Sequence, residues 1–67
     1  MDDKTRELVN IAAAVTGHCQ PCLKHHMAEA KRLGVEEKDI RVAIAIAESV
    51  SRSGDKHMLE FANTLVE

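Results

Sequence analysis

Apolar residues recur at the spacing of an α-helix along nearly the whole chain, and this period limits the fold more than any other feature of the sequence. In residues 5–15 they stand three and four positions apart, which lines one face of a helix. Three further stretches follow the same rule, and none shows the alternation of apolar and polar residues that is typical of strands. The sequence therefore predicts an all-α fold of about four short helices, in a single domain that covers residues 1–67.

Glycine and proline mark the bounds of the first two predicted helices. Gly17 follows the first helix, and Pro21 suits the first turn of a second helix because a proline there loses no intrahelical hydrogen bond. The second helix starts near Cys19 and ends at Gly34. The positions that these two helices turn inward are Leu8, Ile11, Ala12, Val15, Leu23, Met27, Ala30 and Leu33.

The third predicted helix, from about residue 37 to residue 52, is the most apolar of the four. Ser53 and Gly54 are expected to break it, and Asp55 can cap a fourth helix. The inward face of the third helix is Ile40, Ala43, Ile44, Ala47 and Val50, and that of the fourth is Met58, Phe61, Ala62 and Leu65.

The core available to these helices is small. Phe61 is the only aromatic residue, and a chain of 67 residues buries only about 60% of the surface that its unfolded form exposes. Small domains of this kind usually need a disulfide, a metal or a partner subunit. We therefore expect a homo-oligomer, with Val42, Ala45 and Ile46 lying partly off the inward face of the third helix and available to a second subunit.

Charge and hydropathy exclude several classes of partner. Nine basic and eleven acidic residues are interspersed and give a net charge of −2, so a nucleic-acid surface is not expected. No apolar stretch approaches the roughly 18 residues that span a bilayer, and the polar start of the chain lacks a signal-peptide core. The expected location is the cytoplasm, where a closely spaced cysteine pair is more often catalytic or metal-binding than a permanent crosslink.

The stretch "HCQPCLKHH", residues 18–26, holds both cysteines and three of the four histidines. Cys19 and Cys22 stand three apart across a predicted helix start, within reach of a disulfide. The free N–H groups and the positive end of the helix dipole stabilise a thiolate there, and Pro21 stiffens the turn between the two cysteines. This pattern predicts a dithiol that opens and closes.

His26 is the expected proton acceptor for this dithiol. It lies one helical turn after Cys22 on the same face, and a base beside a nucleophile is the general activation pattern. Glu7, on the preceding helix next to its apolar face, is the candidate to orient His26, although a solvated surface carboxylate is the simpler interpretation of that position. Cys19 is expected to be the more exposed cysteine and Cys22 the one closer to His26, so the order of attack stays open.

Other interpretations use the same residues. Zinc would find four ligands in the two cysteines, His26 and one of His18 or His25, although structural zinc sites usually draw ligand pairs from separated elements. A static disulfide and a non-catalytic helical assembly protein also remain. Covalent haem requires a histidine directly after the second cysteine, and that position is Leu23. We expect no metal and no cofactor.

Taken together, Glu7, Cys19, Cys22 and His26 resemble the alkylhydroperoxidase D-like (AhpD-like) branch of the carboxymuconolactone decarboxylase family. The resemblance covers about residues 3–54. It extends through "DDKTRELVNIAAAVTGHCQPCLKHH" and "LGVEEKDIRVAIAIAESVSRSG", which are similar to the helix, dithiol and histidine of the family and to its following turn and Ala/Ile-rich helix.

The resemblance implies an AhpD-like helical fold completed by oligomerisation into trimers or hexamers. It also implies a thiol-dependent oxidoreductase, with Glu7, Cys19, Cys22 and His26 as catalytic residues. The implied substrate is a peroxide or a protein disulfide, and the implied electron donor is a thiol. Decarboxylation is not implied, because the decarboxylase branch lacks the cysteine pair. Pro21 stands where members often have a histidine or tyrosine, which removes one group that can relay protons.

Overall fold

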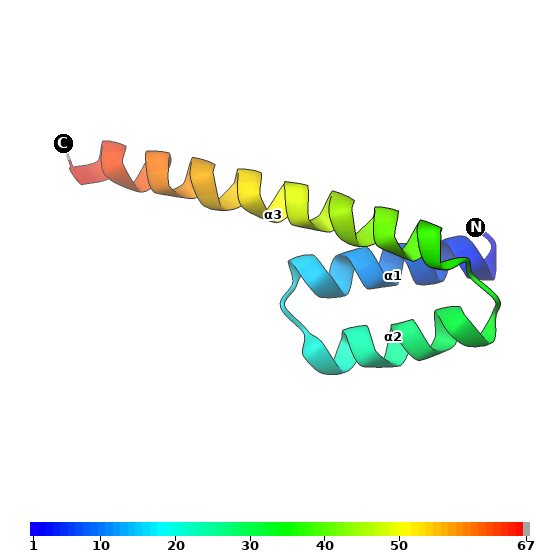
Figure 1. The fold of residues 1–67 in the computed structure, drawn as a ribbon. Coiled ribbons are helices and arrows are strands. Elements are labelled where there is room, and N and C mark those ends of the chain that lie inside the picture. The colour runs from blue at the N-terminus through cyan, green and yellow to red at the C-terminus, as the bar shows by residue number, and fades with distance from the viewer. Residues whose placement is uncertain (67) are drawn as a thin grey trace.

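Three α-helices joined by two short connections form the computed structural model, which describes residues 1–66 (Figure 1). They are α1 (Asp3–Thr16), α2 (Gln20–Arg32) and α3 (Glu37–Val66). The expectation of an all-α fold is confirmed. α2 folds back beside α1, and α3 then runs in the same direction as α1 and continues well beyond it. None of these three helices is both long enough and apolar enough to cross a membrane.

The connection between α1 and α2 is fixed by backbone hydrogen bonds at the end of α1. The N–H of Cys19 donates to the carbonyl of Ala14 (3.0 Å), and the N–H of His18 donates to that of Val15 (3.2 Å). These paired bonds form a Schellman motif, in which the residue directly after the C-cap has a left-handed backbone. His18 takes that position with φ 56°, while Gly17 keeps an ordinary helical φ of −83°.

The end of α2 forms a second Schellman motif, with a glycine at the left-handed position. Gly34, with φ 80°, donates to Lys31 (3.1 Å), and Val35 donates to Ala30 (3.0 Å). Glycine adopts a positive φ without the clash that a Cβ creates, so the chain turns here at little cost. The predicted helix ends near Gly17 and Gly34 are therefore both confirmed.

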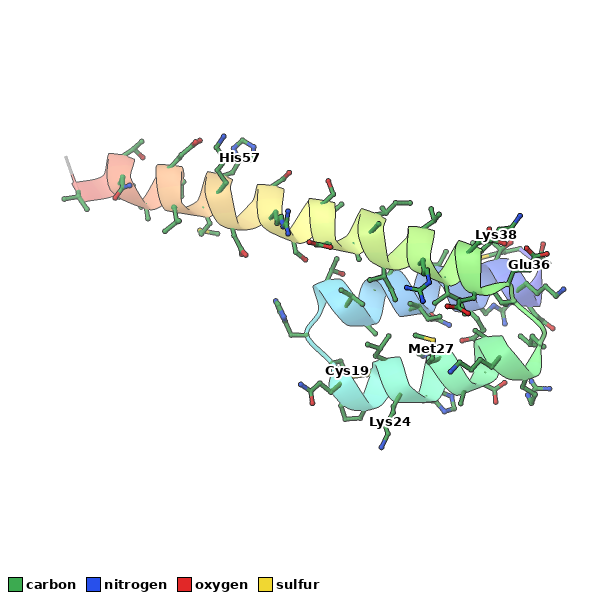
Figure 2. The ribbon with its side chains drawn as sticks, in the orientation of Figure 1. Cys19, Lys24, Met27, Glu36, Lys38 and His57 are labelled. Carbon is green, nitrogen blue, oxygen red and sulfur yellow. A yellow bond between two sulfur atoms is a disulfide. The ribbon has the colours of Figure 1, made fainter. Side chains whose placement is uncertain are left out.

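The core lies where the three helices meet. Ile11 from α1, Ala30 from α2 and Ile40 from α3 form its buried centre. α1 packs against both other helices, and Figure 2 shows Met27 of α2 pointing into the space between them while Lys24 points outward. The partly buried residues around this centre are Leu8, Leu23, Met27, Val35 and Ile44.

The predicted break before a fourth helix is wrong, because α3 runs unbroken through Ser53, Gly54 and Asp55. A lone glycine inside a helix costs only about 1 kcal/mol relative to alanine, and the backbone at Gly54 does not adopt a positive φ. Residues 51–66, called the C-terminal arm below, therefore project past α1 and α2 (Figure 1). Five expected core residues are therefore exposed: Val50 (59%), Met58 (65%), Phe61 (60%), Ala62 and Leu65 (72%).

Candidate redox site

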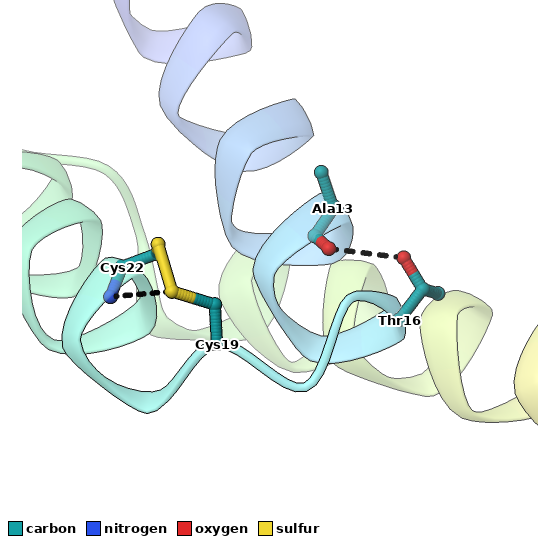
Figure 3. Close-up of a disulfide and its surroundings, with 4 residues drawn as sticks. All are labelled: Ala13, Thr16, Cys19 and Cys22. Carbon is teal, nitrogen blue, oxygen red and sulfur yellow. Dashed lines mark hydrogen bonds between the residues drawn. A yellow bond between two sulfur atoms is a disulfide. The ribbon is translucent and has the colours of Figure 1, made fainter.

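The site begins at the joint between α1 and α2, where Cys19 and Cys22 form a disulfide (Figure 3). Their Cα atoms are 5.3 Å apart, within the usual range for a disulfide. Cys19 is the N-cap residue of α2, and Pro21 is the second residue of the helix, where a missing N–H leaves no helical bond unmade. The close spacing predicted from the sequence is therefore present, and the pair occupies a helix start.

Cys19 is held by both helices at once. Its N–H donates to Ala14 at the end of α1, and its Sγ accepts a hydrogen bond from the N–H of Cys22, 3.3 Å away, at the start of α2. The side chain thus stands in for the oxygen of a usual N-cap residue. When the disulfide opens, the N–H of Cys22 and the positive end of the α2 dipole stabilise a thiolate on Cys19.

The exposure of the two cysteines is the reverse of the expectation. Cys22 is exposed, whereas Cys19 is only partly exposed. Cys19 borders a shallow cavity of about 240 Å³ whose other walls include the last turn of α1. An incoming molecule therefore reaches Cys22 more readily. The residues lining this cavity are Ala14, Val15, His18, Cys19, Gln20 and Leu23.

Glu7 and His26 meet across the interface of α1 and α2. Glu7 Oε2 lies 2.7 Å from His26 Nδ1, although the two residues are 19 positions apart. The side chains are 12% and 26% exposed, so the simpler interpretation of Glu7 as a solvated surface residue is wrong. An ionised carboxylate only accepts hydrogen bonds, so Nδ1 donates its proton to Glu7 and the other ring nitrogen, Nε2, is the basic one.

The disulfide lies at the start of α2, and His26, which bonds Glu7 of α1, lies in the middle of α2. Cys22 and His26 are one turn apart on that helix, which puts them on the same face. Within residues 1–66, no hydrogen bond joins the imidazole of His26 to either sulfur of the closed disulfide. The structure thus joins the four predicted site residues in two bonded pairs, Cys19 with Cys22 and Glu7 with His26.

The remaining histidines differ in their relation to the site. His18 lines the cavity beside Cys19, and its left-handed backbone is part of the joint that positions that cysteine. His25 is exposed, and its ring packs edge-on against that of His26 with 4.9 Å between the centroids. His57 lies on the C-terminal arm, away from the disulfide (Figure 2). The last turn of α1 also lines the site, which the sequence pattern does not predict, because helical periodicity does not show which helix ends meet.

A second carboxylate lies near His26 but is engaged elsewhere. Glu29, one turn further along α2, accepts hydrogen bonds of 2.7 and 3.1 Å from the guanidinium of Arg32. These bonds lower the pKa of Glu29 below its ordinary value, with smaller contributions from the charges of Arg32 and the two neighbouring histidines. The same contact raises the pKa of Arg32. Glu7 is therefore the carboxylate that orients the imidazole.

The ligand set considered for zinc is not assembled in this disulfide form. Within residues 1–66, no three histidine, cysteine, aspartate or glutamate side chains gather closely enough to hold a metal ion. Both sulfurs are bonded to each other, and zinc binds cysteine as the thiolate. The arrangement suits a two-electron disulfide couple with a base one helical turn away.

Comparison with known proteins supports the resemblance seen in the sequence. The model of the carboxymuconolactone decarboxylase family matches residues 1–63. The match includes all four predicted site residues, the whole of α1 and α2 and most of α3. No curated protein and no solved structure gives a significant match to the chain.

Proposed function

Because the chain belongs to the carboxymuconolactone decarboxylase family and carries a cysteine pair at the start of α2, we propose that it is a thiol-dependent oxidoreductase of the AhpD-like branch. The oxidant is a hydroperoxide or the disulfide of a partner protein, and the electron donor is a thiol. The observation that carries the proposal is the Cys19–Cys22 disulfide at the N-terminus of α2. Two cysteines at this position can change between dithiol and disulfide with little backbone movement.

Oxidation begins at Cys22, the exposed cysteine on the face of His26. Nε2 of His26 takes the proton of the Cys22 thiol, and the thiolate attacks the outer oxygen of the hydroperoxide. The O–O bond breaks, and the leaving alkoxide takes the proton from the imidazolium and departs as an alcohol. Cys22 is then a sulfenic acid.

Cys19 completes the oxidation. Its thiolate, stabilised by the N–H of Cys22 and the positive end of α2, attacks the sulfur of the sulfenic acid. The S–O bond breaks as the S–S bond of the disulfide forms. The leaving hydroxide takes up from solvent the proton that the Cys19 thiol had released, and it departs as water. One hydroperoxide and two thiols thus give one alcohol, one water and one disulfide.

Reduction runs through the same two sulfurs. A donor thiolate attacks the exposed Sγ of Cys22 and forms a mixed disulfide, while Cys19 leaves as a thiolate. A thiol of lower pKa is the better leaving group, and the helix start favours that role for Cys19. A second donor thiolate then attacks the donor sulfur of the mixed disulfide, and Cys22 leaves as a thiolate that takes up a proton. Two donor thiols become one donor disulfide.

Single-cysteine variants test both the function and the order of attack. The reduced Cys19→Ser variant should accumulate a sulfenic acid on Cys22 when treated with cumene hydroperoxide, because no resolving thiol remains. Cys22→Ser should react at least about tenfold more slowly, since its remaining sulfur is partly shielded. Dimedone labelling followed by mass spectrometry measures both. The proposal is wrong if the reduced wild-type protein forms no disulfide with cumene hydroperoxide or with a disulfide substrate.

A further inference from the structure

The charge of the chain is unevenly distributed, and its basic part is the segment that carries the disulfide. The chain as a whole has a net charge of −2, whereas residues 18–34 hold three basic residues and one acidic residue, for a net charge of +2. No aspartate or glutamate occurs between Glu7 and Glu29. The two cysteines therefore lie in electropositive surroundings, to which the positive end of α2 adds.

Two lysines of α2 supply this positive charge. Lys24 and Lys31 are exposed, and within residues 1–66 neither forms an ion pair. Arg32, by contrast, is paired with Glu29. The two lysines stand seven positions apart, which is about two helical turns and about 10 Å along one face of the helix. Their charges are thus available to two anionic groups at the same spacing.

A groove of about 580 Å³, called the α2 groove below, lies between these lysines. Leu23 and Met27 are partly buried and give it an apolar side. Figure 2 shows Met27 pointing toward the core and Lys24 pointing away from it, so the groove has an apolar inner wall and a charged rim. The residues lining the α2 groove are Gln20, Leu23, Lys24, Met27, Ala28 and Lys31.

The α2 groove starts at the redox site but faces a different side of the helix from Cys22. Gln20, at one end of the groove, stands between the two cysteines in the chain. Cys22 is two positions from both Gln20 and Lys24, so its side chain points about 160–200° away from theirs around the helix. A small molecule in the groove is therefore separated from the reacting sulfur by the helix itself, which is about 10 Å wide. A macromolecule can cover the groove and still place a thiol at Cys22.

We propose that the thiol donor is a protein that docks an acidic amphipathic helix in the α2 groove. Two carboxylates seven positions apart on that helix match the spacing of Lys24 and Lys31, and apolar side chains between them cover Leu23 and Met27. Opposite charges speed and orient brief encounters, which suits electron-transfer partners. The C-terminal arm of a second copy lacks this complementarity, because residues 51–66 carry as many basic as acidic residues.

The docking rests on the groove and its charges, whereas the role of the docked protein as donor rests on the proposed function. Reduction in the docked complex follows the two attacks described above. A donor thiolate displaces Cys19 from Cys22, and a second donor thiolate then displaces Cys22 from the mixed disulfide. Two donor thiols become one donor disulfide, and the chain regains its dithiol.

Binding of synthetic peptides tests the docking without a redox step. Two fluorescein-labelled helical peptides share one apolar pattern, and the acidic peptide has two glutamates seven positions apart where the basic peptide has lysines. By fluorescence anisotropy at low ionic strength, the oxidised chain should bind the acidic peptide at least about tenfold more tightly. At about 1 M salt, where the Debye length is about 3 Å, the preference should disappear. Because the whole chain is negatively charged, a non-specific effect would favour the basic peptide. Equal affinities at low ionic strength overturn the proposal.

Paired lysine variants locate the docking surface. Lys24→Gln combined with Lys31→Gln should reduce the preference for the acidic peptide to within about twofold. Lys4→Gln combined with Lys56→Gln is the matched control, since it removes the same charge from exposed lysines outside the groove and should leave the preference at about tenfold or more. Equal losses in the two double variants contradict the proposal. A lower mass of the groove variant in sedimentation equilibrium would identify the groove as a contact between copies, which also contradicts it.

Peptides that carry a thiol test the role of the groove in reduction. A cysteine on a flexible linker is added to each peptide, and its rate of reducing the Cys19–Cys22 disulfide is divided by its rate with the neutral bis(2-hydroxyethyl) disulfide. This normalised rate should be at least about tenfold higher for the acidic peptide. Equal normalised rates overturn the donor docking and leave the proposed function intact. A disulfide that dithiothreitol does not reduce refutes the proposed function and the donor role together, while anisotropy alone decides the docking.

Discussion

Replacing Glu7 with glutamine tests whether the carboxylate acts through His26. Glutamine keeps the shape of the side chain and an oxygen that accepts the hydrogen bond from Nδ1, but it removes the negative charge. At the observed 2.7 Å, and with side chains only 12% and 26% exposed, the charge stabilises the imidazolium that forms when the thiol gives up its proton. The variant therefore separates the electrostatic effect of Glu7 from its geometric one.

The expected size of the effect follows from this contact. A hydrogen bond to a charged group contributes about 1.5–3 kcal/mol, and one between neutral groups about 0.5–1.5 kcal/mol. The difference of roughly 1–1.5 kcal/mol corresponds to a rate about tenfold lower for Glu7→Gln. His26→Ala removes the base itself and should lower the rate by roughly 10²-fold or more. In the His26→Ala background, Glu7→Gln should cause almost no further loss, because Glu7 acts only through the imidazole.

The assay counts thiols, because the chain has no tryptophan or tyrosine whose fluorescence would report oxidation. Freshly reduced protein is mixed with excess cumene hydroperoxide, quenched with an alkylating reagent at set times, and analysed by mass spectrometry. Glu29→Gln is the control, since Glu29 is a carboxylate on the helix of His26 that bonds Arg32 instead, and its rate should stay within about twofold of the wild type. Wild-type oxidation rates in both Glu7→Gln and His26→Ala, or fully additive losses of rate in the double variant, would refute the conclusion that Glu7 acts through His26.

Two further predictions concern the helix ends that hold the site in place. Asp2 caps α1 by accepting the N–H of Thr5 (2.7 Å), which lowers its pKa below the ordinary 3.8. A carboxyl whose folded pKa is depressed stabilises the fold above its unfolded pKa and loses that effect as the pH falls through the folded pKa. The melting temperature of Asp2→Ala, followed by circular dichroism, should therefore lie below that of the wild type from about pH 5 upward and approach it below about pH 4; a difference that does not change with pH would contradict the cap. At the left-handed positions, His18→Gly should stabilise the chain by roughly 1 kcal/mol in urea unfolding and Gly34→Ala should destabilise it by about as much. Equal signs for these two substitutions would rule out backbone strain as the cause.

The sequence by itself determined the local features of this protein. The stops near Gly17 and Gly34, the start of α2 at Cys19 and Pro21 and the reach between the two cysteines all depend on neighbours within about one helical turn. Backbone sterics, capping and helical spacing act over that range, so the residue types there are sufficient. The family match over residues 1–63 agrees with the same motif.

Only the tertiary structure decided the features that depend on how the helices pack. Glu7 bonds His26 across 19 positions because α1 and α2 lie side by side, and no periodicity measures that distance. Cys19 is less exposed than Cys22, and it shares a cavity with Ala14 and Val15 from the last turns of α1. The glycine at position 54 does not end α3, because a single glycine weakens a helix by only about 1 kcal/mol and neighbouring helical turns outweigh it. The C-terminal arm is exposed because α1 ends before α3 does, and no local sequence pattern shows how far a neighbouring helix extends.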